Sequence, residues 1–245
     1  MSQAGIPKVI HYCWFGHNPL PKSARRCIAS WKTHFPDYEI REWNETNFDV
    51  DAIPYTREAY ERGKYAFVSD YARFAILYRH GGLYFDTDVE VVRPMDNILA
   101  RGPFMGIEKS ARSLGVNPGL GLAAEPHAAL YRAILDHYAG LHFVDEKGAQ
   151  LPGTVVKHTT DVLLRRGFAP EDRLQQVAGV WIYPNEWFNP LDDATGRLTL
   201  TENTHSIHHY AKTWVDNYGP LRRWITRRLH RIFGLDTLAR LKKYI

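Results

Sequence analysis

The sequence predicts an α/β fold built on a mostly parallel sheet, and three observations favour this class. Short apolar runs rich in β-branched and aromatic residues alternate with segments whose apolar residues recur at helical spacing. The chain has 245 residues, 44% of them hydrophobic and 24% charged, which suits one sizeable domain or a tight pair of half-domains. No internal repeat or low-complexity stretch interrupts the alternation.

The N-terminal part of the chain contains a strand, a helix and a second strand. Residues 8–16 form an apolar, β-rich run ending in glycine, which predicts the first buried strand. Helical spacing of apolar residues over 23–35 predicts a helix with Ser23 as its cap. Alternation over 38–43 predicts the second strand.

The central segment predicts a helix followed directly by a strand. Residues 68–82 have a dense helical core, with Ser69 as the expected N-cap and Gly81-Gly82 as the expected end. Residues 83–92 alternate as one strand. This alternation places four polar side chains on one side of the strand: Tyr84, Asp86, Asp88 and Glu90.

The rest of the chain continues the pattern. We expect strands near 103–108, 178–183 and 205–210, and helices at about 127–139 and 155–166. Strands that alternate with helices indicate parallel pairing, and ligands of such sheets bind at the carboxyl ends of the strands.

The cysteines and the N-terminus bear on the compartment. Cys13 and Cys27 are the only cysteines, fewer than a disulfide-stapled secreted protein would use, so we expect a reducing compartment. The N-terminus lacks a basic region followed by a long apolar run, which disfavours a signal peptide. No stretch approaches the roughly 20 apolar residues of a membrane-spanning helix. The expected location is therefore the cytoplasm.

The C-terminal tail differs in charge from the body of the chain. Residues 221–245 contain eight Lys or Arg residues and one acidic residue, Asp236. Apolar residues at helical spacing between the arginines predict a basic amphipathic helix, which suits the anionic inner face of the cell membrane. Packing of this helix on the body is the alternative. We expect a domain at 1–220 and a tail at 221–245, and no nucleic-acid partner because no recognition motif accompanies the basic residues.

Two carboxylates near the predicted end of the central strand suggest a metal site. Asp86 and Asp88 stand two residues apart, so both can reach one divalent cation. Mn²⁺ and Mg²⁺ prefer oxygen ligands and commonly combine one or two carboxylates with substrate phosphates. A nucleotide diphosphate supplies such phosphates. Taken alone, the pair equally fits two solvated acids at a strand end.

The helix before this strand adds an acid and a base. Asp70 and Arg73 are three residues apart and share one helical face. The planar fork of Arg73 suits phosphate or sugar oxygens, and Asp70 can accept hydrogen bonds from sugar hydroxyls. A local ion pair at the start of the helix is the alternative.

The whole run from Ser69 to Val91 resembles the central motif of glycosyltransferase family 32, the DXD enzymes that include yeast mannosyltransferases and bacterial capsular and lipooligosaccharide transferases. It is similar, more distantly, to the clostridial glucosylating toxins. The segments 6–16, 180–190 and 203–214 resemble the opening and closing parts of the same family. The resemblance implies a GT-A-type, Rossmann-like mixed sheet flanked by helices. It also implies retaining, Mn²⁺- or Mg²⁺-dependent transfer of a hexose from a UDP- or GDP-sugar to a saccharide or lipid-linked acceptor in surface polysaccharide synthesis.

The resemblance also assigns residues. It implies that Trp14 stacks on the nucleotide base, Asn117 faces the donor sugar, His208 is the third metal ligand and Trp214 approaches the diphosphate. His209 leaves the choice of histidine open, and Thr213 stands where the family usually has Ser. The expected catalytic residues are Asp70, Arg73 and Asp86; the expected donor contacts are Trp14, Asp70, Arg73, Tyr84, Asp86, Asn117 and Trp214; the expected metal ligands are Asp86, Asp88 and His208.

Two other functions compete with this interpretation. A catalytically inactive carbohydrate- or nucleotide-binding protein on the same fold would keep many of these residues. A metal-dependent phosphohydrolase is the second, because 85–91 resembles the start of a haloacid dehalogenase motif. That motif expects Thr or Val where this chain has Glu90, and it normally lies near the N-terminus.

Overall fold

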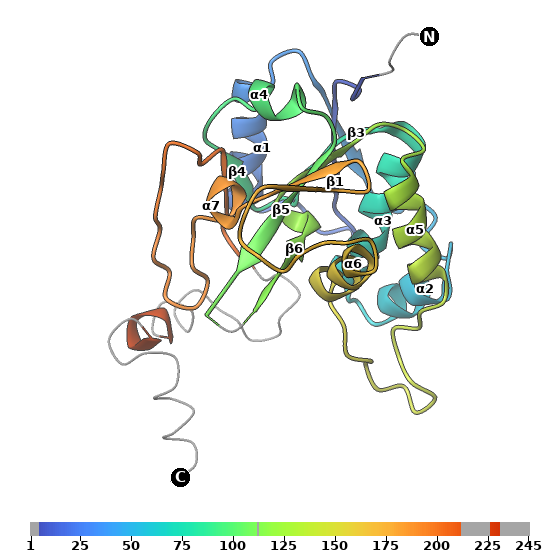
Figure 1. The fold of residues 1–245 in the computed structure, drawn as a ribbon. Helices are drawn as coiled ribbons and strands as arrows, with labels where there is room; N and C mark the ends of the chain where they lie inside the picture. Colours follow the sequence, from blue (N-terminus) through green and yellow to red (C-terminus); the bar gives the residue numbers. More distant parts are fainter. Residues whose placement is uncertain (1–4, 112, 212–225, 231–245) are drawn as a thin grey trace.

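The computed structural model describes residues 5–111, 113–211 and 226–230, in which helices cover both faces of a central sheet (Figure 1). One hydrophobic core joins the sheet to α2, α3, α5 and α6, and the other joins it to α1 and α4. The described helices are α1 (Lys22–His34), α2 (Pro54–Glu61), α3 (Tyr65–His80), α4 (Asp96–Leu99), α5 (Ala129–Ala139), α6 (Val155–Leu164), α7 (Asn185–Phe188) and the 3₁₀ turn η1 (Pro118–Leu120).

The sheet has eight strands among the described residues, in the order β2-β1-β3-β7-β5-β9-β8, with β6 paired to β5. These are β1 (Val9–Cys13), β2 (Glu39–Trp43), β3 (Gly82–Tyr84), β5 (Phe104–Lys109), β6 (Leu114–Asn117), β7 (Leu122–Ala124), β8 (Gln175–Val177) and β9 (Val180–Tyr183). β1 pairs in parallel with β2 and β3, and β5 with β9, whereas β7 is antiparallel to both β3 and β5. The predicted mixed α/β sheet is therefore confirmed, and β1, β2, β3, β5 and β9 run in one direction.

The predicted helices are present, but two of them begin earlier than expected. Pro21 precedes α1, so Ser23 lies inside the first turn and is not its cap. α3 begins at Tyr65, and the Ser69 hydroxyl donates to the Tyr65 carbonyl within the helix. The predicted end is correct, because Gly81 terminates α3 with a φ of 64°, a conformation that favours glycine.

The single strand predicted over 83–92 is wrong. The chain forms β3, leaves the sheet after Tyr84, and resumes as β4 (Val89–Val91), which pairs with β10 (Ser206–His208) in a separate two-stranded sheet. The Asp86 amide donates to the Gly119 carbonyl and the Val89 amide to the Asp86 carbonyl, which turns the chain between the strands. The two acids therefore lie on a loop, and tertiary hydrogen bonds override the strand-like alternation.

The glycine-rich segment 115–127 contains most of β6, η1 and β7. α2, α4, α7 and β8 are further elements that the periodicity did not indicate. α4, α7 and β8 have only three or four residues, and α2 has eight, so each carries few periodic positions.

The predicted tail falls largely outside the described residues, as does Trp214. Residues 226–230 are helical. Arg227 donates from Nη2 to Asp193 Oδ1 at 3.1 Å, and His230 Nδ1 lies 3.1 Å from the Ala194 carbonyl. This part of the tail therefore packs on the loop at 192–196. No described helix combines the length and the hydropathy that crossing a bilayer requires.

Candidate active site

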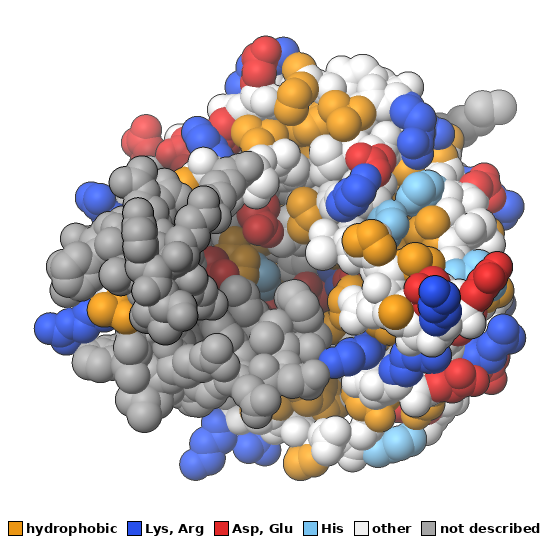
Figure 2. Space-filling view, turned by 90° about the horizontal axis from the view of Figure 1, so that it is seen from below, with side chains coloured by type: hydrophobic (Ala, Val, Ile, Leu, Met, Phe, Trp, Pro, Cys, Tyr) orange, Lys and Arg blue, Asp and Glu red, His pale blue; other side chains and the backbone are white. Residues whose placement is uncertain are grey.

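A cleft of about 890 Å³ lies between two walls of the domain. One wall comes from the end of β1 and the first half of α3, and the other from β6 and α6. The loop between β3 and β4 and the residues that follow β10 close one end. Figure 2 shows the hollow with acidic side chains inside it. Of the predicted site residues that the structure describes, all line the cleft except Tyr84, which lies just behind Asp86.

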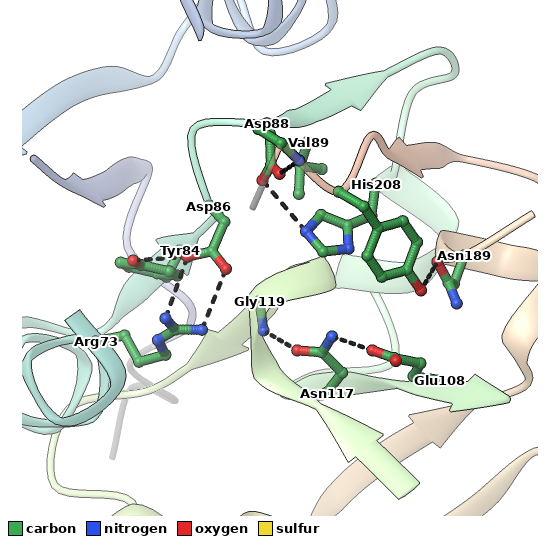
Figure 3. Close-up of polar contacts among 12 residues, drawn as sticks. Arg73, Tyr84, Asp86, Asp88, Val89, Glu108, Asn117, Gly119, Asn189 and His208 are labelled. Carbon is green, nitrogen blue, oxygen red and sulfur yellow. Dashed lines mark hydrogen bonds and ion pairs between the residues drawn. The ribbon is translucent and has the colours of Figure 1, made fainter. Parts of the chain in front are cut away.

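Arg73 is the centre of a buried ion-pair network on the α3 side (Figure 3). Its side chain is 3% exposed, and its Nη2 lies 2.8 Å from Asp70 Oδ1 and 3.2 Å from Asp86 Oδ1. Nε donates to the Ser69 carbonyl at 3.0 Å, and the guanidinium carbon lies 5.0 Å from the centre of the Tyr84 ring. The predicted Asp70–Arg73 pair is present, and the fork of Arg73 is directed at carboxylates of the protein itself.

Asp86 is held in a fixed orientation from three sides. Arg73 donates to it, and the Tyr84 hydroxyl donates to Oδ1 at 3.0 Å. On the third side lies Gly119, where an added Cβ would collide with Oδ2. Burial raises the pKa of Asp86, as does the charge of Asp88, and Arg73 opposes this shift. The carboxylate is therefore partly buried and held in one orientation.

Asp88 is held by residues far away in the sequence. The pairing of β10 with β4 places His208 opposite Val89, and His208 Nε2 then lies 3.2 Å from Asp88 Oδ1. The Ala211 amide donates to Asp88 Oδ2 at 2.7 Å. Burial opposes ionisation, but His208 and these hydrogen bonds outweigh it and lower the pKa of Asp88 to about 2.

The two adjacent histidines point to different places. His208 is 8% exposed and faces the two acids, whereas His209 Nε2 lies 2.7 Å from Glu90 Oε2 outside the cleft. Successive side chains of an extended segment alternate in direction, which explains the separation. The geometry therefore selects His208 as the histidine of the acid cluster.

Asp86, Asp88 and His208 form a donor set that fits a divalent cation. One ligand atom from each lies within 4.8 Å of the others. Two carboxylates and an imidazole suit Mn²⁺ or Mg²⁺. His208 Nδ1 is buried and has no hydrogen-bond partner among the described residues, which leaves this ring incompletely satisfied without a further ligand. Burial would lower the pKa of His208, but Asp88 raises it to about 9, so the cluster favours positive charge between its acids.

The other predicted contacts occupy the remaining cleft. Trp14 lies in the β1 wall, and its Nε1 donates to the Asn18 carbonyl at 2.5 Å. Asn117 is buried at the end of β6, where its Oδ1 accepts from the Gly119 amide at 2.7 Å and its Nδ2 donates to Glu108. The amide of Asn117 is thus fixed in one orientation.

Sequence reasoning missed several residues that line the cleft. Glu108 precedes an exposed lysine at the end of β5 and resembles an ordinary surface acid in the sequence. Tyr210 has a φ of 53°, and its hydroxyl donates to Asn189 Oδ1 at 2.9 Å. The centre of its ring lies 4.3 Å from that of His208, with the two rings tilted by 50°. Lys157 and Asp161 line the α6 wall. The pairing of β5 with β6, the packing of α6 against β6 and the pairing of β10 with β4 bring these residues to the site. No local signal in the sequence therefore marks them.

Comparison with known proteins agrees with this geometry. Residues 21–105 match the family described as a glycosyltransferase sugar-binding region containing a DXD motif, and this span includes Asp86 and Asp88. The match covers about a third of the chain. The α/β structure of the PaToxG glycosyltransferase superposes with a TM-score of 0.50 at 18% identity, over 65% of this chain and 69% of that one. This similarity confirms the GT-A-type fold.

Two curated relatives have similar sequences. The inositol phosphoceramide mannosyltransferase 1 of Schizosaccharomyces pombe is 30% identical over 140 residues, which are 53% of this chain and 42% of that protein. The uncharacterized glycosyltransferase L373 of Acanthamoeba polyphaga mimivirus is 34% identical over 109 residues, 40% of this chain and 42% of that protein. The chain therefore matches these relatives over about two fifths of their length, in a stretch shared by proteins named for sugar transfer.

Proposed function

We propose that this protein is a metal-dependent glycosyltransferase that moves a hexose from a UDP- or GDP-sugar to a hydroxyl of a saccharide or lipid-linked acceptor. The observation that carries the proposal is the convergence of Asp86, Asp88 and His208 within 4.8 Å at the closed end of a large cleft, beside the buried Arg73. The DXD sugar-binding region over residues 21–105 supports the same assignment.

Asp86, Asp88 and His208 would hold Mn²⁺ or Mg²⁺. The bound cation would neutralise the charge that develops on the departing diphosphate. The protein orients each ligand beforehand: Arg73 and Tyr84 fix Asp86, and the Ala211 amide fixes Asp88. Such preorganisation means that the ligands need little rearrangement when the substrate binds.

The donor would lie along the β1–α3 wall. Trp14 offers its ring to the nucleotide base, Asp70 accepts hydrogen bonds from sugar hydroxyls, and Asn117 faces the sugar from the opposite wall. Arg73 contributes positive charge next to the leaving group while it holds Asp70 and Asp86. In the transfer, the bond from the anomeric carbon to the diphosphate oxygen breaks, and a bond from that carbon to the acceptor oxygen forms. The acceptor proton passes to a diphosphate oxygen.

The proposal includes retention of anomeric configuration and a role in surface polysaccharide synthesis. We assign no protein nucleophile, because Asp70 is already paired with Arg73 and Asp86 is a proposed metal ligand. The acceptor would attack on the face that the diphosphate leaves, which gives retention without a covalent intermediate. For the basic tail at 221–245 we propose contact with the anionic inner face of the cell membrane, beside the Arg227–Asp193 contact that anchors residues 226–230 to the body.

The test is donor hydrolysis in the absence of an acceptor. The purified protein is incubated with Mn²⁺ and a panel of UDP- and GDP-sugars, and released nucleotide diphosphate is measured. We expect slow hydrolysis of one donor that EDTA abolishes and that Asp88→Asn reduces by about 10³-fold, since the variant removes a charged metal ligand. Asp136→Asn on α5, an exposed acid outside the cleft, is the matched control.

Calorimetry decides the result if no donor is hydrolysed. If one nucleotide sugar binds in a Mn²⁺-dependent manner and Asp88→Asn loses this binding, the protein has a donor site whose reaction requires the acceptor. Absence of both hydrolysis and Mn²⁺-dependent binding would overturn the proposal. Donor binding with no transfer to any acceptor would instead favour the inactive binding protein.

A further inference from the structure

The α6 wall of the cleft contains a polar face that the donor does not need. Thr154, Lys157 and Asp161 follow each other at helical spacing along α6, and all three line the cleft. The opposite face of α6 is apolar and buried in the core through Val162 and Leu163. The helix thus packs with one side and presents the other to the cleft.

This face is rigidly attached to the sheet. The Thr160 hydroxyl accepts from the Val116 amide of β6 at 2.9 Å. Gly115 allows the close approach, because a Cβ there would lie 2.8 Å from both Thr160 Oγ1 and Val156 Cγ1. Since β6 also carries Asn117, α6 and the donor-facing end of β6 form one rigid unit.

The charged pair on this face does not hold the fold together. Lys157 Nζ lies 2.5 Å from Asp161 Oδ2, and the two side chains are 62% and 32% exposed. An exposed pair at this spacing contributes only about 0.3–0.5 kcal/mol to a helix. Both side chains can therefore exchange this contact for a ligand at little cost, unlike Arg73, which is buried with its partners.

We propose that this face, Thr154, Lys157 and Asp161, is the acceptor subsite and that it binds a neutral saccharide through its hydroxyls. The inference rests on the proposed function. The metal ligands fix the diphosphate at the closed end of the cleft, and Trp14 draws the nucleotide to the β1 wall, which leaves the α6 wall for the second substrate. A carboxylate that accepts and an ammonium that donates, side by side, match adjacent hydroxyls of a hexose.

The charge of the cleft selects against an acidic acceptor. The permanent cations that line it among the described residues are Arg73 and Lys157, against a larger number of carboxylates. These acids are Asp70, Asp86, Asp88, Glu108, Asp161 and Asp193. A divalent cation and a donor diphosphate largely cancel each other, so the cleft remains negative and repels a carboxylate or phosphate on the acceptor.

The experiment compares transfer with donor hydrolysis in the same reaction. The donor is the nucleotide sugar selected by hydrolysis with Mn²⁺, and the probes are methyl mannoside, methyl galactoside, methyl glucoside and methyl glucuronide. We expect transfer to at least one neutral glycoside and none to the glucuronide. In Lys157→Met and Asp161→Asn, the ratio of transfer to hydrolysis falls about tenfold through a higher acceptor KM, as the loss of one charge-assisted hydrogen bond implies.

The chain offers a matched control for these variants. Arg132 and Asp136 form an i,i+4 pair on α5 with 61% and 56% exposure, outside the cleft. Arg132→Met and Asp136→Asn should leave the ratio unchanged. Saturation-transfer NMR gives a second readout that requires no turnover. It measures binding of the glycosides to the protein loaded with nucleoside diphosphate and Mg²⁺, which is diamagnetic and leaves the glycoside signals sharp.

Several outcomes would overturn the acceptor subsite. These are an unchanged ratio in both α6 variants, equal transfer to the glucuronide, or neither transfer to nor binding of any neutral glycoside by the unaltered protein. If donor hydrolysis itself is absent and no donor binds, the proposed function fails, which is a different result. Hydrolysis that continues while the ratio stays unchanged removes only the acceptor assignment.

Discussion

The two aspartates of the DXD motif stand two residues apart, yet they belong to two differently built halves of the site. The Asp86 half contains Asp70, Arg73 and Tyr84, and its ion pair joins residues three apart in the sequence. The Asp88 half contains His208 and Ala211, and its hydrogen bond to Ala211 joins residues 123 apart.

The two halves should contribute differently to the stability of the fold and to metal binding. In the Asp86 half, Asp70 and Arg73 are buried, so removal of one of them leaves the other as a buried charge without this partner. The Asp88 half depends on the pairing of β4 with β10, three residues in each strand, at the edge of the cleft. Loss of a residue from the Asp88 half should weaken metal binding more than it lowers the free energy of unfolding. Arg73→Met, His208→Ala and Gly119→Ala test this division.

The largest effect is expected from Arg73→Met, which leaves Asp70 and Asp86 facing each other without their shared cation. Breaking a buried ion pair from one side typically costs about 3–5 kcal/mol. We expect a loss of this size in the free energy of urea unfolding, together with loss of donor hydrolysis. Arg132→Met, in an exposed pair, should change the stability by less than about 1 kcal/mol. If the two variants were equally stable, the ion pairs of Arg73 would not stabilise the fold as proposed.

The next effect separates the two histidines. His208→Ala removes one of the three proposed metal ligands. We expect the Mn²⁺ affinity measured by calorimetry to fall by about 100-fold, in the range found when the surroundings of a bound metal are altered. His209→Ala removes only the contact with Glu90 and should keep the affinity within about threefold, because an exposed pair contributes little. If His209→Ala caused the greater loss, the ligand assignment would be wrong.

The same division explains what the sequence predicted. Asp70, Arg73, Tyr84 and Asp86 lie in one run of the sequence. The helical period placed Asp70 and Arg73 on one face, and the family resemblance, rather than the strand period, joined this pair to Asp86. The class of the fold also followed from the alternation of apolar segments, because burial in a sheet covered by helices imposes that pattern. Even here the exact end of β3 was missed, since only the hydrogen bond of Asp86 to Gly119 ends the strand.

The Asp88 half could be predicted only from the resemblance to the glycosyltransferase family. Nothing local to residues 203–211 indicates that they pair with Val89–Val91, and periodicity did not distinguish His208 from His209. The pairing register decides it, because a shift by one residue would turn His209 toward the acids. Glu108, Lys157 and Asp161 were missed for the same reason: their role depends on which strand β6 joins and which helix covers it.

A smaller effect concerns His11, which secures the end of α3 before the motif. Its Nε2 lies 3.1 Å from the Gly81 carbonyl, and its Nδ1 accepts from Trp43 Nε1 at 3.0 Å. Burial lowers the pKa of His11 to about 4, below the 6.5 of an exposed histidine, although the Gly81 contact opposes the shift. Below pH 6.5 the imidazole of His11 therefore binds a proton in the unfolded chain but not in the folded one.

Stability should consequently fall as the pH drops from 6.5 toward 4, with no contribution from this group above 6.5. We expect His11 to account for about 2 kcal/mol of lost stability between pH 7 and pH 5. His11→Asn should reduce the pH dependence of the unfolding free energy by that amount, whatever its stability at pH 7. Comparison of the two proteins cancels the groups they share, including Asp70, whose raised pKa acts in the opposite direction. Parallel pH profiles would contradict this account.

The smallest effect comes from Gly119→Ala. The added methyl group would collide with Asp86 Oδ2, a side-chain atom, so the backbone can remain and the free energy of unfolding should change little. The carboxylate must rotate against Arg73 and Tyr84, and we expect about a tenfold loss of Mn²⁺ affinity, or roughly 1.4 kcal/mol. In Gly115→Ala the added methyl group would collide with Thr160 and Val156 of α6 instead. This variant should lower the free energy of unfolding and leave the Mn²⁺ affinity unchanged. If Gly119→Ala bound Mn²⁺ normally, the orientation of Asp86 by its neighbours would be unnecessary, and the Asp86 half would serve the fold alone.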